Sequence, residues 1–242
     1  MYPELFTIGS FTIYTYGLLV AIGFFVGMQY IIKYSSNIPM KKQQVYDFLF
    51  YLILVGILGA RLLYVLTNID FFIKHPLDIV KVWQGGLVFY GGFLAVLVFA
   101  FFYCRNKRID IKKFADVSAP ALALGHCLGR IGCFFSGCCY GRECDFLLSV
   151  NHKHPTQLYE SFGNLMIFFM LHHISKKEHK KGLIFVSYLC MYAVLRFFVE
   201  FFRGDDRGAF IVGLSIAQVI SLLIFTISFI WLFINYGVKN EK

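Results

Sequence analysis

The residues best suited to chemistry lie in one run of the sequence, GRIGCFFSGCCYG at positions 129–141. The run combines Arg130 with three cysteines and four glycines. An arginine in apolar surroundings is costly unless it faces a polar site, and glycines let backbone and ligand approach closely. The run is therefore a candidate binding or catalytic site.

Two more arginines, Arg61 and Arg196, interrupt apolar segments elsewhere in the chain. A charge at the centre of a membrane costs about 2.5 to 3.5 kcal/mol, so such side chains normally face a polar partner or a ligand. Tyr192 and Glu200 lie four residues to either side of Arg196, which puts the three residues on one face of a helix. Polar chemistry is expected on that face.

The composition predicts the class of protein that holds these residues. Of 242 residues, 58% are hydrophobic and only 15% are charged, and the mean hydropathy is +0.66. A water-soluble domain of this size cannot hide so much apolar surface, so a polytopic all-helical membrane protein is expected. The net charge of +9 lies in short clusters between apolar runs, which argues against a nucleic-acid partner. No motif calls for a cofactor.

Seven apolar segments are long enough to span a membrane as helices. No soluble domain fits between them, so residues 1–242 are expected to form a single membrane domain. The first segment is expected to stay in the protein, because no small-residue cleavage site follows it. The predicted spans are residues 13–32, 47–67, 86–104, 115–135, 158–175, 182–202 and 213–236.

Lysine and arginine residues are distributed unevenly among the predicted loops. Most of them lie in the loops at 33–42, 105–113 and 176–181 and in the C-terminal tail. By the positive-inside rule these segments face the cytoplasm, which places the N-terminus outside and the C-terminus inside. Arg61, Arg130 and Arg196 then share the outer half of the membrane.

Three arginines at one depth predict a site for an anion. Only Glu160 and Glu200 are expected near enough to neutralise them, so the site should carry excess positive charge. In the outer leaflet the abundant anion is a phospholipid phosphate, which suits the planar guanidinium group. Two simpler interpretations stay open. Arg196 and Glu200 could form a structural ion pair, and Arg61 could extend to the membrane surface.

Four segments carry motifs that can be compared with known families: GRIGCFFSGCCYG at 129–141, HPTQLYE at 154–160, YAVLRFFVEFFR at 192–203 and GGLVFYGGFLAV at 85–96. Together they resemble the prolipoprotein diacylglyceryl transferase family, over nearly the whole chain. The resemblance implies an enzyme of the bacterial cytoplasmic membrane, with its site toward the outer leaflet. It would move the diacylglyceryl group of phosphatidylglycerol onto the lipobox cysteine of an exported prolipoprotein and release glycerol phosphate, without a metal.

The resemblance also implies roles for individual residues. Arg130 and Arg196 would clamp the lipid phosphate. Glu200 would orient Arg196, and Tyr192 would donate a hydrogen bond to the headgroup. The other residues implied to bind phosphatidylglycerol are Tyr16, Gly17, Arg61, Gly91, Gly92 and Gly141.

The chain differs from the family pattern at three positions. Where the family usually reads HGGL, this chain has Tyr90 in place of the histidine that would be the general base. Cys133 and Cys138 stand where the family usually has an asparagine and a glutamate. Tyrosine is a weaker base at neutral pH, because its reference pKa is about 10. Tyr90, Cys133 and Cys138 are candidate catalytic groups, and His154 could replace the base or cap a helix.

The cysteines near this run allow several roles. Cys133, Cys138, Cys139 and Cys144 are expected in an oxidising compartment, where one or two disulfides are the simplest outcome. Alternatively, Cys133 or Cys138 acts as a nucleophile or redox switch, with Arg130 lowering the pKa of the thiol. A metal site is not expected, because the spacing lacks paired C-x-x-C motifs and no histidine lies at ligand spacing.

Two classes of function stay open. The first is a diacylglyceryl transferase that acts on phosphatidylglycerol and a prolipoprotein. The second is a divergent relative that binds lipid, or performs thiol chemistry through its cysteines, without transferase activity. A transporter is disfavoured, because the charged residues gather at one face instead of at the midplane between two related halves.

Overall fold

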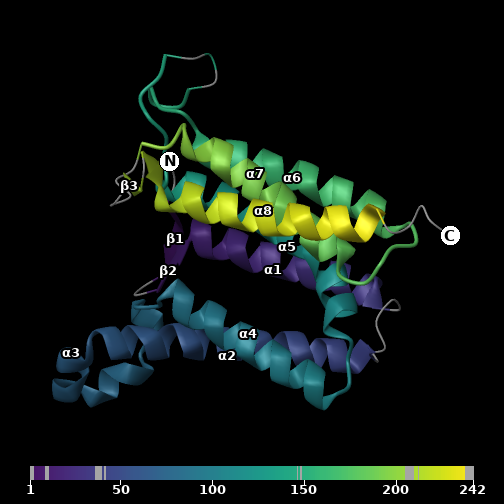
Figure 1. Ribbon diagram of the computed structural model, residues 1–242. Helices are drawn as coiled ribbons and strands as arrows, with labels where there is room; N and C mark the ends of the chain where they lie inside the picture. The colour runs from purple at the N-terminus through teal and green to yellow at the C-terminus, as the bar shows by residue number, and fades with distance from the viewer. Residues whose placement is uncertain are drawn as a thin grey trace. The chain divides into compact units, whose positions relative to one another are not determined.

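The computed structural model is built almost entirely from helices (Figure 1). It describes residues 3–8, 11–35, 40, 42–145, 147, 149–204, 210–211 and 213–237. The chain divides into two compact units, Met1–Lys33 with Ala115–Lys242 and Tyr34–Phe114. Four basic residues used to predict the orientation lie outside the described ranges, namely Lys41, Arg207, Lys239 and Lys242.

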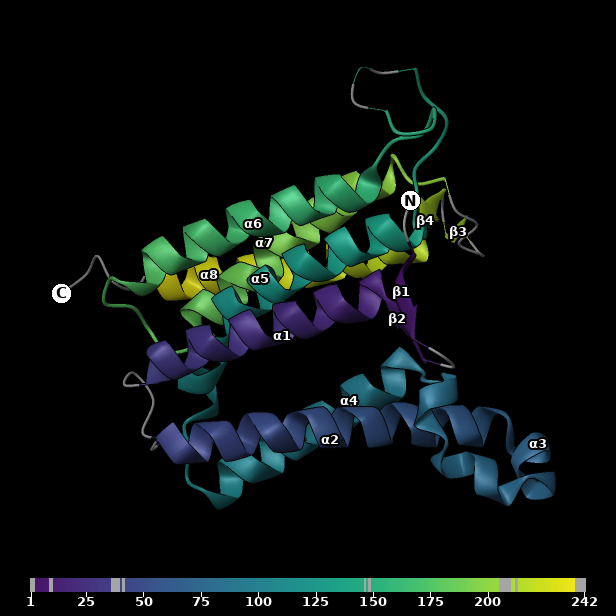
Figure 2. The same ribbon diagram turned by 180° about the vertical axis from the view of Figure 1, so that it is seen from behind.

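The first unit is a helical bundle with two short antiparallel hairpins. Its helices α1, α5, α6, α7 and α8 lie side by side in both views (Figures 1 and 2). Strand β1 pairs with β2, and β3 pairs with β4. The elements are β1 (Glu4–Ile8), β2 (Phe11–Tyr14), α1 (Thr15–Lys33), α5 (Ile111–Ser136), α6 (Thr156–Ser175), α7 (Leu183–Glu200), β3 (Phe210–Ile211), β4 (Leu214–Ser215) and α8 (Ile216–Gly237).

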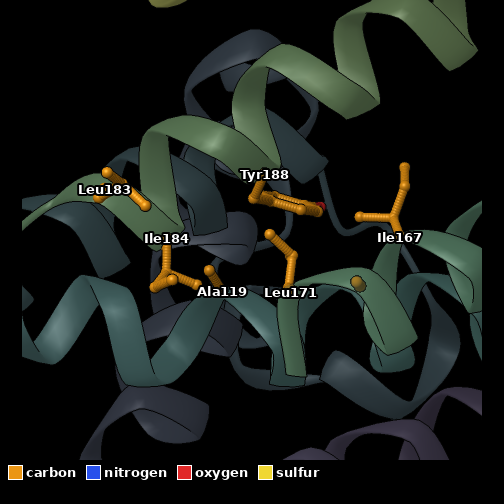
Figure 3. Close-up of a cluster of buried hydrophobic side chains, with 7 residues drawn as sticks. Ala119, Ile167, Leu171, Leu183, Ile184 and Tyr188 are labelled. Atoms are coloured by element: carbon orange, nitrogen blue, oxygen red, sulfur yellow. The ribbon is translucent and has the colours of Figure 1, made fainter. Parts of the chain in front are cut away.

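The core of the first unit lies where α5, α6 and α7 meet (Figure 3). Ala119 and Ala123 of α5 are fully buried, and they share the cluster with Leu171 of α6 and Ile184 of α7. Small residues let helix backbones approach closely, and this packing drives helix association in lipid, where the hydrophobic effect between helices is absent. Tyr188 of α7 belongs to the same cluster and also contacts the polar site described below.

A buried carboxylate fixes the start of α7. Asp116 of α5 accepts hydrogen bonds from the backbone N–H groups of Gly182, at 2.6 Å, and Phe185, at 2.9 Å. The first N–H groups of a helix have no partner within the helix, so a side-chain acceptor there stabilises it. Asp116 therefore holds α7 in position against α5.

The second unit consists of α2 (Lys42–Thr67), α3 (Ile69–Lys74), two 3-10 turns (Pro76–Val80 and Val82–Gln84) and α4 (Phe89–Asn106). Helices α2 and α4 pack closely through glycines. A Cβ placed on Gly59 would lie 2.7 Å from the carbonyl oxygen of Gly91, so the two backbones touch where neither residue has a side chain. Farther along the pair, the ring of Phe48 packs against those of Phe99 and Tyr103.

Six of the described helices, α1, α2, α4, α5, α7 and α8, are long and apolar enough to cross a membrane. The chain is therefore a multi-pass helical membrane protein. The segment predicted as a span at 158–175 also forms a helix, α6, but α6 is not among the six. Its buried face carries Gln157, Glu160 and Asn164, which lower its hydropathy. Pro120 lies inside α5 without ending it.

Candidate active site

Glu160 of α6 is the centre of a buried charged network in the first unit. Its Oε1 atom lies 3.0 Å from Nη2 of Arg130 and accepts a hydrogen bond of 3.1 Å from the hydroxyl of Tyr192. Its Oε2 atom lies 3.6 Å from Nη1 of Arg196. Only 1% of the Glu160 side chain is exposed. One carboxylate therefore joins an arginine of α5 to an arginine of α7.

Glu200 completes the network at the end of α7. Its Oε2 atom lies 2.6 Å from Nη2 of Arg196, one helical turn earlier, which confirms the ion pair predicted from the spacing. Its Oε1 atom accepts a hydrogen bond of 2.9 Å from Ser215, which ties the network to the start of α8. Arg196 is thus held by two carboxylates from two helices.

Within the network two arginines face two glutamates, and the third predicted arginine, Arg61, belongs to the other unit. Buried Arg203 is also near enough to interact electrostatically with Arg196. Several polar atoms are nevertheless incompletely satisfied. Among the described residues, Nη1 of Arg196 and Oε2 of Glu160 and of Glu200 are buried without a hydrogen-bond partner. Each of these atoms nevertheless lies in an ion pair, since Oε2 of Glu200 is 2.6 Å from Nη2 of Arg196 and Oε2 of Glu160 is 3.6 Å from Nη1 of Arg196.

Aromatic side chains and a histidine border the network. His126, one turn before Arg130 on α5, forms a 3.2 Å hydrogen bond between its Nδ1 atom and the hydroxyl of Tyr188. Its ring lies beside that of Tyr192, with 5.0 Å between the ring centroids. His126 therefore lies beside the charged network. The sequence did not indicate which way this residue faces.

Tyr16 of α1 joins the same region, as the sequence predicted. A Cβ placed on Gly132 would lie 3.2 Å from Cδ2 of Tyr16, so the glycine, which directly precedes Cys133, lets the tyrosine lie against α5. The phenol is near enough to interact electrostatically with Arg130 and Cys133. Its neighbour Gly17 faces open space, because a Cβ there would meet no atom within 4 Å.

The HPTQLYE motif anchors the loop that follows α5. Thr156, which is fully buried, donates a 2.8 Å hydrogen bond to the carbonyl oxygen of Cys139, and buried Gln157 donates one to that of Cys138. His154 does not cap α6, which corrects one of the two roles predicted for it. Its Nδ1 atom instead hydrogen-bonds with the hydroxyl of Tyr159, at 3.2 Å.

Gly141 is a point of close backbone packing. Its N–H donates a 2.9 Å hydrogen bond to the carbonyl oxygen of His154. A Cβ on Gly141 would lie 2.5 Å from Cβ of His154 and 2.6 Å from the carbonyl oxygen of Phe202. Only glycine fits between these two segments. Gly141 therefore serves the close packing of the loop against the chain that follows α7.

The loop also gathers three thiols. The sulfur atoms of Cys133, Cys138 and Cys139 lie within 4.8 Å of one another, and the last two are 3.1 Å apart. All seven cysteines of the chain lie in its described part and are free, so the expected disulfides are not formed. Buried Arg203 donates a hydrogen bond to Cys139.

The sequence predicted that Arg130 would lower the pKa of Cys133 or Cys138. Burial raises the pKa of the Cys138 thiol, contrary to expectation. Hydrogen bonding with the thiols of Cys133 and Cys138, together with Arg203, lowers the pKa of Cys139. Hydrogen bonds to the charged form of a group favour that form.

The remaining predicted site residues lie in the second unit. Arg61 is 7% exposed and does not extend to the surface. Its guanidinium donates hydrogen bonds to four backbone carbonyl oxygens, those of Asp78, Ile79, Gly85 and Gly86. These bonds fix the segment between α3 and α4.

The other three predicted residues of this unit lie on α4. Gly91 and Gly92 pack against Gly59 and Gly56 of α2, so both contribute to the helix contact. Tyr90 is 70% exposed. The structure therefore brings Tyr16, Arg130, Cys133, Cys138, Tyr192, Arg196, Glu200 and Gly141 together within the first unit, and describes Arg61, Tyr90, Gly91 and Gly92 within the second.

Fold and site together define a multi-pass membrane protein with a buried arginine–glutamate network that joins α5, α6 and α7. Residues 3–234 match the family described as prolipoprotein diacylglyceryl transferase. This chain therefore belongs to the prolipoprotein diacylglyceryl transferase family, a family of transferase enzymes.

Individual relatives agree with the family match. The chain is 36% identical to the phosphatidylglycerol–prolipoprotein diacylglyceryl transferase of Clostridium tetani, over 92% of this chain and 93% of the relative. It is 32% identical to the protein of the same name from Geobacter sulfurreducens, over 92% and 91%. The relative of that name in Finegoldia magna is also 32% identical, over 90% of each chain. The sequence resemblance is thus confirmed over nearly the whole chain.

Proposed function

We propose that this protein transfers the diacylglyceryl group of phosphatidylglycerol to the lipobox cysteine of an exported prolipoprotein. The thiol sulfur forms a bond to a glycerol carbon of the lipid, the bond from that carbon to the phosphate ester oxygen breaks, and glycerol phosphate leaves. The observation that carries the proposal is the pair of arginines joined by Glu160, in a chain whose relatives bear this activity in their names.

Arg130 is the residue we assign to the phosphate. It keeps 20% of its side chain exposed, whereas Arg196 keeps 11% and is held by two carboxylates. The leaving phosphate gathers negative charge in the transition state, and a guanidinium already in place stabilises that charge without reorganisation. Glu160 and Glu200 position Arg196, and Tyr192 and Tyr16 are hydroxyl donors beside Arg130. Glu160 also compensates the arginine charges when no lipid is bound.

The acceptor thiol must lose its proton before it attacks. Tyr90 is the base implied by its position in the motif. His126 is a second candidate, because its imidazole lies beside Tyr192 and interacts electrostatically with Arg130 and Glu160. Histidine titrates near neutral pH, which suits general base catalysis better than a phenol does. Loss of turnover in His126→Asn with retained turnover in Tyr90→Phe would favour the histidine.

We further propose seven spans in one membrane domain of residues 1–242, with α6 as the span beyond the six apolar helices. Phe162, Phe169 and Met170 on α6 are all more than half exposed, as expected for a lipid-facing surface, while its polar face is buried. The distribution of basic residues supports an external N-terminus, a cytoplasmic C-terminus and a site toward the outer leaflet of the bacterial cytoplasmic membrane. Labelling of single cysteines introduced in the loops of intact cells tests this orientation.

The function is tested with the purified full-length protein in phosphatidylglycerol nanodiscs, with a lipobox peptide as acceptor and glycerol phosphate release as the readout. Arg130→Ala should lower the rate at least about 100-fold, as the loss of a preorganised electrostatic group typically does. Arg105→Ala, at the end of α4, is the matched control and should keep full activity. No turnover by the wild type, or an unchanged rate in Arg130→Ala, would refute the proposal. Lipid binding without turnover would favour the lipid-binding alternative.

A further inference from the structure

The three thiols at the end of α5 have no role in the proposed transfer. Cys133 lies in the last turn of α5, and Cys138 and Cys139 follow in the loop. Their sulfur atoms all lie within 4.8 Å of one another. The spacing of these cysteines in the sequence differs from the usual paired motifs, so only the fold brings the three sulfurs to one point.

The backbone around the thiols is held in place from outside the cluster. Cys139 adopts a left-handed conformation, with φ of 65°, which few residues other than glycine adopt without strain. The carbonyl oxygens of Cys138 and Cys139 are bound by Gln157 and Thr156, which are both buried. These contacts use the backbone of the loop and leave the side chains to face one another.

The distances suit a thiophilic metal ion. Zinc binds thiolate sulfur at about 2.3 Å, so two sulfurs of a tetrahedral site lie about 3.8 Å apart. The sulfurs of Cys138 and Cys139 are 3.1 Å apart, and all three lie within 4.8 Å, so movements of about 1 Å or less would form the site. Thiolates select zinc and other soft or borderline metals over magnesium or calcium.

Two guanidinium groups lie beside the cluster. Arg203 is buried and donates a hydrogen bond to Cys139, and Arg130 is near enough to interact electrostatically with Cys133 and Cys139. Three thiolates with a divalent ion carry a net charge of −1, which these guanidinium groups offset. Cys138 is exposed, so the fourth position of a tetrahedral ion can be reached by water.

We propose that Cys133, Cys138 and Cys139 form a binding site for Zn²⁺, with water as the fourth ligand. Each thiol that is still protonated gives up its proton when it binds the metal. The bound ion connects the last turn of α5 to the loop before α6, next to Arg130. Coordination uses the sulfur electrons that a nucleophile would need, so this assignment replaces a nucleophilic role for these cysteines.

The experiment uses the full-length protein purified without oxygen, in a phosphine reductant, and freed of metal with a chelator. Zn²⁺ is then added and bound metal is counted by elemental analysis, and a competing chromophoric chelator reports the affinity. Co²⁺ serves as a second probe, because cobalt–thiolate coordination gives a strong charge-transfer absorption. We expect one Zn²⁺ per chain and a cobalt–thiolate spectrum.

Cys138→Ser is the decisive variant, because Cys138 is exposed and its replacement leaves the packing intact. Its zinc affinity should fall at least about 100-fold, since losing even an outer-shell partner costs 10- to 100-fold. Cys190→Ser on α7 lies outside the cluster and should bind zinc as the wild type does. Equal affinity in Cys138→Ser, or much less than one Zn²⁺ per wild-type chain, would each overturn the proposal.

Discussion

Replacing Glu160 with glutamine removes one negative charge and almost no volume from the centre of the network. The amide can still accept the hydrogen bond from Tyr192, but it no longer neutralises Arg130 and Arg196. Breaking a buried ion pair by removing one partner destabilises a protein by about 3 to 5 kcal/mol. Arg130 is 20% exposed and Arg196 keeps Glu200, so we expect the lower end, about 3 kcal/mol.

The assay is thermal unfolding of the purified protein in detergent. For a chain of this size, about 3 kcal/mol corresponds to a decrease in Tm of about 6 to 12 °C. Glu143→Gln is the matched control, because Glu143 is exposed in the loop after α5 and should unfold as the wild type does. Added glycerol phosphate should raise the Tm of Glu160→Gln more than that of the wild type, because the anion replaces the missing charge.

Two results would refute this reasoning. If Glu160→Gln and Glu143→Gln unfold at the same temperature, the carboxylate of Glu160 does not compensate the arginines, and the network is not held by charge. If glycerol phosphate raises the Tm of Glu160→Gln no more than that of the wild type, the anion does not bind between Arg130 and Arg196. The second result would also weaken the assignment of Arg130 to the lipid phosphate.

The other predictions concern single contacts. Gly141→Ala should lower the Tm by several degrees, because its Cβ would lie 2.5 Å from Cβ of His154. Gly17→Ala is the control and should not lower the Tm, because Gly17 faces open space. Equal Tm values for the two variants would contradict the close packing at Gly141. Asp116→Ala should cost about 1 to 2 kcal/mol through loss of the cap on α7, seen as a lower Tm, and an unchanged Tm would argue against the cap. Arg61→Lys should destabilise the protein by about 2 to 4 kcal/mol, because an ammonium group cannot bind all four carbonyl oxygens that the guanidinium binds. A protease should then cleave the segment at 78–86 faster than in the wild type.

The sequence predicted the helices well, because a membrane requires long apolar segments whatever their neighbours are. Helices were found in all seven predicted segments, and Pro120 did not interrupt α5. The prediction was least informative for α6, whose polar residues lower its hydropathy although they face the inside of the bundle. Hydropathy measures composition, and it cannot tell a buried polar face from an exposed one.

The sequence also indicated which arginines needed partners, but it could not choose the partners reliably. The pair of Arg196 and Glu200 was predictable, because four residues make one turn of a helix. The central position of Glu160 was not, because it depends on how α5, α6 and α7 pack around one carboxylate. Arg61 was expected to bind lipid, yet its donors are used by carbonyl groups of a loop that the sequence left undefined.

What the sequence by itself determined is the membrane class, the family and the ion pair within one helix, since composition, motifs and local spacing are properties of the chain alone. Only the tertiary structure decided the rest. Glu160 meets two arginines because three helices converge, and three thiols meet because Cys139 turns the chain back while Thr156 and Gln157 hold its backbone. Such contacts depend on distances between segments far apart in the sequence, and these distances exist only after the helices have packed.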